Sequence, residues 1–263
     1  MSDFKCEEVM PFESSASGKT QQIEQMFDDI APHYDTMNRL MSLGQDKSWR
    51  QKAIKRLKQT NPNTILDVAT GTADFALSAY DAIQPARIVG VDISEEMIRV
   101  GEEKVKAAKK SDFIDLMRAD SMNLPFDSQS FDAATIAFGV RNFESLEKGL
   151  TEICRVIRDG GSLAILELSV PTNPFYRFGY RIFTKIFIPI MAKILKTNST
   201  AYSYLPESID AFPQGEVMKE LLLKVGFKEV EIKKYTMQTC TFYFFISTSL
   251  NPTFKSNSFI TSP

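Results

Sequence analysis

Residues 63–92 constrain the fold of this chain more than any other stretch. Residues 64–69 are typical of a short buried strand, which ends in a turn of small residues, Ala69-Thr-Gly-Thr-Ala73, and a helical pattern begins at Asp74. A second apolar run at 88–92 ends in a carboxylate. Small side chains let a ligand approach the backbone, and the amides at a helix N-terminus can bind it. This order of elements is typical of a nucleoside-binding half of a doubly wound sheet.

Strands and helices alternate along the rest of the chain. The apolar pattern predicts strands at 64–69, 87–92, 113–118, 133–138 and 163–168, separated by helices at 74–84, 94–109 and 145–157. A tight turn at 159–161 precedes the fifth strand, and a helix at 214–225 precedes two last strands at 229–235 and 239–248. Those two strands must be antiparallel, because parallel strands need a long crossover. The sequence therefore predicts an α/β protein with a Rossmann-like, seven-stranded, mostly parallel sheet and an antiparallel last strand.

The segments outside this alternation define the domain organisation. Residues 1–20 are polar and small, so we expect a flexible N-terminus, and we expect residues 251–263 to be a flexible tail. Residues 21–250 have a length that suits one α/β domain. Within it, residues 21–60 show helical patterns before the first strand, and residues 172–210 are a predicted helical insertion after the fifth strand.

The composition argues against several classes of protein. A net charge of −2 over 263 residues argues against nucleic acid as a partner. The three cysteines, Cys6, Cys154 and Cys240, are widely spaced, which argues against structural disulfides and against a metal site and favours a reducing, cytosolic setting. The first residues lack the apolar region of a secretory signal, and no uncharged apolar run reaches the roughly 18 residues that a membrane span needs.

The turn at 69–73 favours one cofactor over another. Dinucleotide sites normally carry G-x-G-x-x-G with the pyrophosphate at the helix N-terminus, but this turn has glycine only at Gly71, and the acid Asp74 opens the helix. An acid there would repel a pyrophosphate, whereas it suits the ammonium or sulfonium of S-adenosylmethionine. Residues 118–126 add a polar strand end and an apolar loop that can flank an adenine. These features favour S-adenosylmethionine, and a nicotinamide cofactor stays the alternative.

Longer motifs are spread over the chain from about residue 22 to residue 248. They are Met26-Phe-Asp-Asp-Ile-Ala-Pro-His-Tyr-Asp-Thr-Met-Asn38, Leu66-Asp-Val-Ala-Thr-Gly-Thr-Ala-Asp74, Leu124-Pro-Phe126, Phe138-Gly-Val-Arg-Asn142, Gly160-Gly161 and Tyr202-Ser-Tyr-Leu-Pro-Glu-Ser208. With these motifs the chain resembles the demethylmenaquinone and 2-polyprenyl-benzoquinol C-methyltransferase family, and most of all its menaquinone branch. The motifs around Tyr34 and Arg141 are specific to that family, whereas the glycine turn and Leu-Pro-Phe occur in many methyltransferases. The resemblance implies a class I methyltransferase fold and S-adenosylmethionine as cofactor.

The resemblance also implies cofactor contacts around the turn. Thr72 would bind the cofactor through its hydroxyl or amide, between Gly71 and the acid Asp74. Asp92 would accept hydrogen bonds from both ribose hydroxyls. The alternative for Asp92 is a capping acid for the helix that begins at Ser94.

Further implied contacts lie beyond the second strand and at the turn itself. Asp120 and Ser121 would face the adenine, and the position of Ala137 often carries a serine near the cofactor. The family usually has glycine at the positions of Thr70 and Ala73. We expect the methyl group of Ala73 to be tolerated if its φ angle is negative.

Methylation of a quinol ring needs an electron-rich carbon, which the loss of a phenolic proton supplies. Arg141 follows the fourth strand, where the reacting groups would meet. Arginine stays protonated, so Arg141 would stabilise a phenolate or orient a water molecule, and Asn142 would hydrogen-bond the other quinol oxygen. The alternative for Arg141 is a structural salt bridge.

Four more residues are candidates for the region that covers the site. Tyr34 and Asp35 are catalytic candidates on a helical lid, and Tyr202 and Tyr204 are candidates for substrate contacts. The alternative for all four is packing between the lid and the sheet. The single histidine, His33, is expected at the surface or in packing, because the family tolerates other residues there.

Residues 173–196 combine large apolar side chains with cations and contain no acid. The cations are Arg177, Arg181, Lys185, Lys193 and Lys196. A helix pair of this composition, broken near Pro189, suits an anionic membrane surface or the mouth of an apolar tunnel. The alternative is a lid helix with a solvated basic rim. A peripheral protein at the cytoplasmic face of the membrane is therefore expected, and a homodimer is compatible with the sequence.

The resemblance thus implies transfer of a methyl group from S-adenosylmethionine to a ring carbon of demethylmenaquinol, a polyprenyl quinol, which completes menaquinone. The alternatives are C-methylation of a polyprenyl-benzoquinol in ubiquinone biosynthesis and another small-molecule methyltransferase. A nicotinamide oxidoreductase and a membrane-bound, non-catalytic cofactor-binding module represent two other classes.

Overall fold

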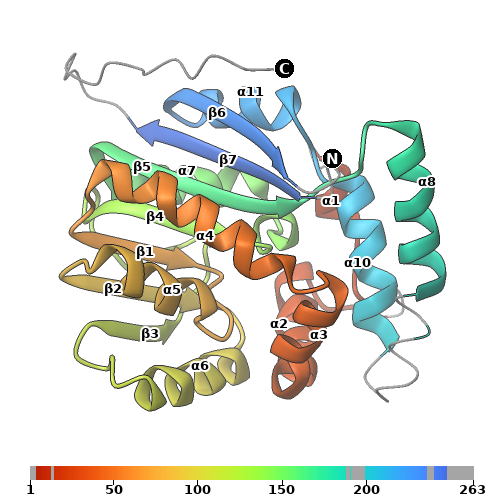
Figure 1. Ribbon diagram of the computed structural model, residues 1–263, viewed down its shortest axis with the longest axis horizontal. Helices are drawn as coiled ribbons and strands as arrows, with labels where there is room; N and C mark the ends of the chain where they lie inside the picture. Colours follow the sequence, from red (N-terminus) through yellow and green to blue (C-terminus); the bar gives the residue numbers. More distant parts are fainter. Residues whose placement is uncertain (1–3, 13–14, 188–189, 191–198, 236–239, 248–263) are drawn as a thin grey trace.

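The seven strands form one sheet in the order β3-β2-β1-β4-β5-β7-β6 (Figure 1). The computed structural model describes residues 4–12, 15–187, 190, 199–235 and 240–247. The strands are β1 (Thr64–Val68), β2 (Arg87–Asp92), β3 (Ile114–Arg118), β4 (Phe131–Ala137), β5 (Ile157–Leu168), β6 (Phe227–Tyr235) and β7 (Cys240–Ser247). Neighbours from β3 to β5 pair in parallel, whereas β7 is antiparallel to both β5 and β6. The predicted mostly parallel sheet with an antiparallel last strand is confirmed.

The helices begin at capping residues that the sequence makes visible. Ser94 accepts a hydrogen bond from the amide of Met97 at 3.1 Å, as predicted, and Ser145 and Asn173 cap two later helices in the same way. The helices before the sheet are α1 (Lys5–Glu8), α2 (Lys19–Ile30), η1 (Ala31–His33), α3 (Tyr34–Met41), α4 (Gln45–Leu57) and η2 (Lys58–Thr60). The later ones are α5 (Asp74–Ile83), α6 (Glu95–Ala107), η3 (Val140–Asn142), α7 (Leu146–Val156), α8 (Pro174–Ile182), the π-helical turn η4 (Phe183–Phe187), α10 (Ser199–Ala211) and α11 (Glu216–Lys224).

Alternating side chains of the central strands divide the core into two layers. Leu66 and Val68 of β1 pack with α7 and α11, whereas Ile65 packs with α4 and α5 on the other face. Trp49 and Leu57 of α4 are buried in this second layer. The predicted helical lid at residues 21–60 is therefore shorter, because α4 belongs to the core.

The N-terminal segment differs from the predicted flexible segment. Cys6 of α1 is completely buried, and the buried Lys19 donates a hydrogen bond to its carbonyl oxygen. The side chain of Gln22 accepts from the amide of Phe12 and donates to the carbonyl oxygen of Ser17, both at 2.8 Å. These buried polar contacts hold residues 4–12 and 15–20 on the domain, so the prediction of a flexible N-terminus is wrong for them.

The predicted tight turn at residues 159–161 is part of β5. The pairing of β4 with β5 shifts between Phe131, opposite Ile157, and Ala133, opposite Ser162. Gly160 has a φ of +79° in this irregular segment. The local twist therefore interrupts the strand pairing without ending the strand.

Helices α2, α3, α8 and α10 stand together at the end of the sheet to which the parallel strands point (Figure 1). This is the edge at which open α/β sheets bind ligands. Of the insertion predicted at 172–210, α8, η4 and α10 are described, whereas Pro189, Lys193 and Lys196 lie outside the described residues, as does the predicted tail at 251–263. Among the described helices, none has the length and apolar character needed to cross a bilayer.

Candidate active site

The turn after β1 is tight because three of its residues have a left-handed backbone. Ala69, Gly71 and Ala73 have φ angles of +52°, +55° and +64°. The hydroxyl of Thr70 fixes the turn by donating to Asp67 at 2.6 Å. The expected tolerance of the Ala73 methyl group depends on a negative φ; this φ is positive, and a left-handed conformation costs a residue with a Cβ atom roughly 1–2 kcal/mol. Ala73 is completely buried, so packing against the core offsets this strain.

Asp92, at the end of β2, closes the turn from the side. Its carboxylate accepts hydrogen bonds from the amide of Gly71 at 2.8 Å and from the amide of Ser94 at 3.0 Å. Burial raises the pKa of Asp92 to about 6, although these amides favour the charged form. A carboxylate has about four acceptor sites, so Asp92 keeps acceptor capacity beside these amides and that of Ile93. Both predicted roles, helix capping and acceptance from a ligand, therefore fit the same side chain.

A narrow cavity lies between this turn and α2. Its volume is about 70 Å³, well below the roughly 300–1,000 Å³ that is usual for small-molecule sites. Ile23 and Phe27 of α2 and Tyr34 of α3 form its cover. The predicted residues that line it are Tyr34, Gly71, Asp92, Asp120, Ser121, Ala137 and Asn142. The N-terminal helices thus form one wall of this cavity.

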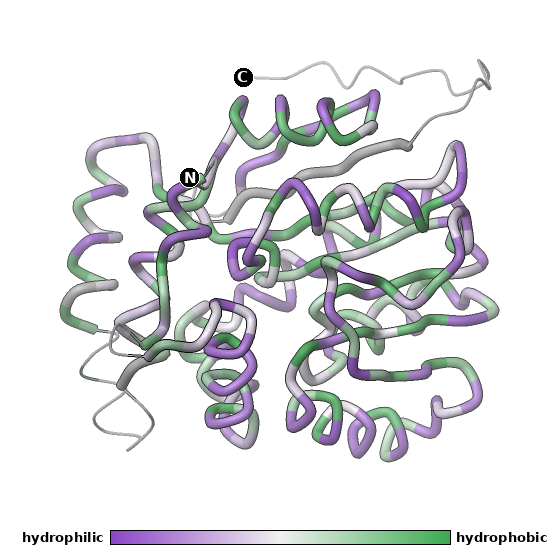
Figure 2. Tube along the Cα trace, turned by 180° about the vertical axis from the view of Figure 1, so that it is seen from behind, coloured by the Kyte–Doolittle hydropathy of each residue, from purple (hydrophilic) through white to green (hydrophobic). Residues whose placement is uncertain are grey.

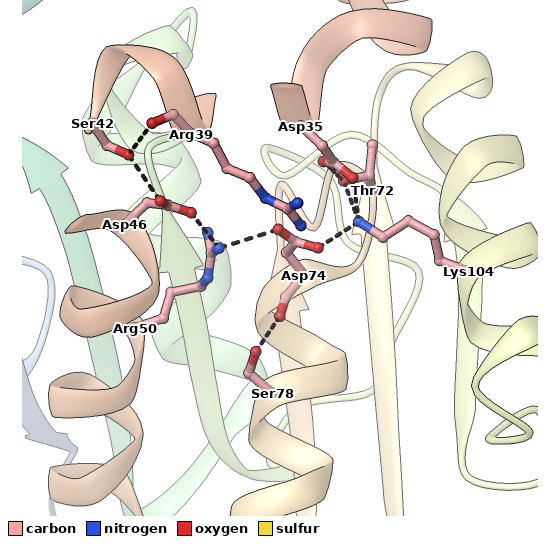
Figure 3. Close-up of polar contacts among 9 residues, drawn as sticks. All are labelled: Asp35, Arg39, Ser42, Asp46, Arg50, Thr72, Asp74, Ser78 and Lys104. Carbon is pink, nitrogen blue, oxygen red and sulfur yellow. Dashed lines mark hydrogen bonds and ion pairs between the residues drawn. The ribbon is translucent and has the colours of Figure 1, made fainter. Parts of the chain in front are cut away.

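Thr72, Asp74 and Asp35 lie behind the turn, in a charged network (Figure 3). Lys104 of α6 donates to Asp35 at 2.6 Å and to Thr72 at 3.0 Å, and it forms an ion pair with Asp74. The other carboxylate oxygen of Asp74 accepts from Arg50 of α4 at 3.1 Å. Burial acts to raise the pKa of Asp74, but the two cations lower it below its usual value. The structure does not bring these three predicted residues to the lining of the narrow cavity.

Arg141 forms a buried ion pair with Glu167, at the end of β5. Its Nη1 lies 2.7 Å from Oε1 of Glu167, and the side chains are 7% and 0% exposed. Nη1 also donates to the carbonyl oxygen of Phe138 at 2.5 Å, and Nε donates to Ser208 at 3.3 Å. Burial works against the charge, but Glu167 more than compensates and raises the pKa of Arg141. The predicted salt bridge exists, and it fixes a permanent cation at this position.

Asn142 links the fourth strand to the insertion. Tyr204 of α10 is buried and donates a hydrogen bond to Oδ1 of Asn142 at 3.1 Å. Burial raises the pKa of Tyr204, so its phenol stays protonated. Tyr202 also belongs to α10, but its side chain lies outside the described part. His33 is exposed in η1, away from these contacts.

A second cavity, of about 750 Å³, lies between α2, α3, α8 and α10. Most of its lining is apolar, and Arg141, Tyr180 and Tyr204 are among its polar residues. The apolar residues include Met26, Ile30, Met37, Met41, Trp49, Leu168, Phe175, Phe178, Phe183, Leu205 and Ile209. This cavity can hold a large apolar molecule that carries a few polar groups.

Three aromatic residues line both cavities: Phe27, Tyr34 and Phe138. The rings of Phe27 and Tyr34 meet edge to face with centroids 6.1 Å apart, and Trp49 supports Phe138 in the same way at 6.2 Å. Burial raises the pKa of Tyr34. Ligands in the two cavities would therefore approach each other at this aromatic wall.

Sequence reasoning missed three residues that shape the site. Glu167 carries the counter-charge of Arg141, Lys104 joins the turn to α3, and Tyr180 lines the second cavity. An acid inside the apolar run of the fifth strand was a visible signal for Glu167, because a buried acid needs a partner. Lys104 and Tyr180 lie on polar or amphipathic helices, where no local pattern distinguishes them.

The family model described as the ubiE/COQ5 methyltransferase family matches residues 15–246. The chain belongs to this family. It is 49% identical over 237 residues to the demethylmenaquinone methyltransferase of Bacteroides fragilis, covering 90% of this chain and 96% of that one. The corresponding enzyme of Porphyromonas gingivalis is 42% identical over 238 residues, which cover 90% and 97% of the two chains. A Geobacter protein named ubiquinone/menaquinone biosynthesis C-methyltransferase is 44% identical over 230 residues, or 86% and 97% of the two chains.

Solved structures agree with a Rossmann-like class I methyltransferase fold. The [4+2]-cyclase SpnF has a TM-score of 0.66 at 16% identity and covers 87% of this chain and 97% of its own. Phosphoethanolamine N-methyltransferase 2 of Haemonchus contortus, in complex with S-adenosyl-L-methionine, has a TM-score of 0.56 at 16% identity, covering 76% and 53%. The predicted family and the use of S-adenosylmethionine are confirmed by family membership. In this methyltransferase, Asp92 beside the left-handed turn fits a ligand with ribose hydroxyls, because its carboxylate has acceptor sites left.

Proposed function

We propose that this methyltransferase transfers the methyl group of S-adenosylmethionine to a ring carbon of demethylmenaquinol and so produces menaquinol. Two relatives that are 49% and 42% identical over 90% of the chain are named demethylmenaquinone methyltransferases. The observation that carries the proposal is the pair of cavities that share the wall formed by Phe27, Tyr34 and Phe138. One cavity contains Asp92, and the other is large and apolar enough for a prenylated ring.

The narrow cavity would hold the cofactor. Asp92 would accept from the ribose hydroxyls, Gly71 would allow close approach, and Asp120 and Ser121 would face the adenine. Thr72, on the far side of the turn, would act through the network that holds the turn in place. When bound, S-adenosylmethionine supplies an electrophilic methyl group.

The second cavity would orient the quinol and raise the electron density of its ring. Arg141 is buried and permanently charged, so it would stabilise the phenolate form of the oxygen beside the reacting carbon. Tyr204 lines this cavity and would help to position the ring, and its hydrogen bond holds Asn142 beside it, in the lining of the narrow cavity. Tyr34 would close the reacting region from the lid, where excluding water strengthens each of these interactions. Arg141 itself does not remove the phenolic proton, because it stays protonated.

The test is an anaerobic assay with a methyl-labelled donor and two reduced acceptors, a prenylated demethylnaphthoquinol and a polyprenyl-benzoquinol. We expect label in the ring of the naphthoquinol. Binding of S-adenosylhomocysteine without methylation of either acceptor would refute the proposal and support a non-catalytic module. Label in the benzoquinol alone would assign the chain to ubiquinone biosynthesis, a second candidate that the printed name of the Geobacter relative favours.

We also propose that α8 and η4 bind a membrane surface at the cytoplasmic face. Phe175, Phe178, Ile182 and Ile186 are 80%, 67%, 44% and 55% exposed, and their spacing places them on one helix face. Figure 2 shows α8 at the edge of the molecule, apart from the sheet. Phe175 and Phe178 also line the second cavity, so a prenyl tail could enter it from the bilayer.

Flotation with anionic phospholipid vesicles tests this surface. Ile182→Glu should reduce the bound fraction, whereas Leu223→Glu, at an equally exposed position on α11 (43% against 44%), should not. Equal binding of both variants would refute the membrane role of α8. A homodimer stays a prediction, which sedimentation analysis would test.

A further inference from the structure

The proposed function leaves one group in the second cavity without a role, the hydroxyl of Tyr180. Tyr180 lies on α8 and lines this cavity. Its Oη is buried and has no hydrogen-bond partner among the described residues. An unpaired buried hydroxyl destabilises a folded protein, so native structures that retain one commonly use it.

The other buried side-chain polar atoms of this lining have partners among the described residues. Tyr204 donates to Asn142 at 3.1 Å, Thr184 donates to the carbonyl oxygen of Tyr180 at 3.0 Å, and Ser42 donates to Asp46 at 2.8 Å. Arg141 is held by Glu167. Within the described part of the chain, the Tyr180 hydroxyl is therefore the buried side-chain group of this lining that has no protein partner and can bond to a molecule in the cavity.

The position of Tyr180 indicates which part of a quinol it would meet. Tyr34 and Phe138 belong to the wall between the cavities, and Arg141 binds the carbonyl oxygen of Phe138 at that wall. Tyr180 lines only the second cavity, on the insertion helix. A quinol whose reacting carbon faces the wall places the adjacent oxygen near Arg141. Its other oxygen, on the opposite side of the ring, then points away from the wall, toward the insertion.

We propose that Tyr180 donates a hydrogen bond through Oη to the quinol oxygen remote from the methylated carbon and so positions the ring. This inference rests on the proposed function. Burial raises the pKa of Tyr180, with Asp210 adding to the shift and Arg141 opposing it, so the phenol keeps its proton at neutral pH. Tyr180 is a substrate-positioning residue in this arrangement, and no bond to it forms or breaks.

The test compares Tyr180→Phe with the unaltered enzyme on two acceptors. One is prenylated demethylnaphthoquinol, and the other is a prenylated 1-naphthol that keeps only the hydroxyl beside the reacting carbon. We expect kcat/KM to fall about tenfold with the quinol, the effect of one hydrogen bond, and to change less than twofold with the naphthol. Tyr80→Phe, on α5 and outside the lining of both cavities, is the matched control and should leave both values unchanged.

The melting temperature of the free enzyme separates this role from a structural one. Tyr180→Phe removes an unpaired buried hydroxyl, so its melting temperature should equal or exceed that of the unaltered enzyme, with unchanged affinity for S-adenosylhomocysteine. The inference is overturned if Tyr180→Phe leaves kcat/KM with the quinol unchanged, or if it lowers kcat/KM equally with both acceptors. In either case the proposed function stands. If the unaltered enzyme methylates neither quinol, the proposed function fails first and the inference fails with it.

Discussion

Substitution of Arg141 by methionine should lower both the free energy of unfolding and the turnover. A second substitution, at Glu167, should restore the free energy of unfolding but not the turnover. Nη1 of Arg141 and Oε1 of Glu167 are 2.7 Å apart, with exposures of 7% and 0%. Removing one member of such a pair leaves a buried charge and costs roughly 3–5 kcal/mol. This is a large part of the 5–15 kcal/mol that is usual for a folded domain.

The double variant Arg141→Met, Glu167→Gln removes the buried charge together with its partner. Glutamine keeps one oxygen, which can accept from the amide of Leu168 as Oε1 of Glu167 does at 2.8 Å, whereas the longer bond from the amide of Arg141 to Oε2, at 3.3 Å, is lost. We therefore expect its free energy of unfolding to lie within about 1–2 kcal/mol of the unaltered enzyme. Its turnover should stay about 10²–10³-fold low, as for the loss of a group that stabilises developing negative charge.

Urea denaturation measures the stability of the three proteins, and labelled-methyl transfer below 25 °C measures their turnover. Affinity for S-adenosylhomocysteine should be nearly unchanged, because Arg141 lines only the second cavity. Arg158→Met is the matched control: it breaks an ion pair with Asp132 whose side chains are 46% and 28% exposed, so it should cost less than about 1 kcal/mol. Recovery of turnover in the double variant would show that Arg141 has only a structural role and would refute the reasoning.

Three further outcomes are expected. Because the pKa of Asp92 is about 6, affinity for S-adenosylhomocysteine should fall about tenfold from pH 7 to pH 5 as the carboxylate takes up its proton. In calorimetric titrations, Asp92→Asn should bind this ligand weakly and without the pH dependence. Asp35→Asn breaks the partly exposed ion pair between Asp35 of α3 and Lys104 of α6, so release of the same ligand in stopped-flow experiments should be about two- to fivefold faster. Asp81→Asn, which breaks the ion pair with Lys110, is the control and should leave the release rate unchanged. Gly139→Ala places a Cβ atom 2.5 Å from that of Ala69 and should lower the free energy of unfolding, measured by urea denaturation, by about 1–3 kcal/mol. At Gly179 a Cβ atom would meet no atom within 4 Å, so Gly179→Ala should leave the free energy of unfolding unchanged or raise it.

The elements and the mostly parallel character of the sheet could be predicted because each element carries its own pattern. Short apolar runs, capping residues and the short last connection specify the elements, and handedness limits their arrangement. The positions of charges could not be predicted in the same way. Asp74 suggested a free acid at a helix N-terminus, but Lys104 and Arg50 neutralise it in the folded chain. Those cations come from α6 and α4, and only tertiary packing brings the three side chains together.

The division of the motifs between the two cavities explains why the family was easier to predict than the site. Gly71 belongs to a turn that many methyltransferases share, and it lines the cavity assigned to the cofactor. Tyr34 and Phe138 belong to the motifs specific to this family, and they form the wall at which the second cavity begins. A motif specific to the family therefore lies beside the cavity that we propose for the acceptor. Tyr180 lines the same cavity, but it lies in an amphipathic helix whose exposed apolar face dominates the sequence pattern. Its buried hydroxyl can be recognised only from the structure, which shows both the cavity and the missing hydrogen bond.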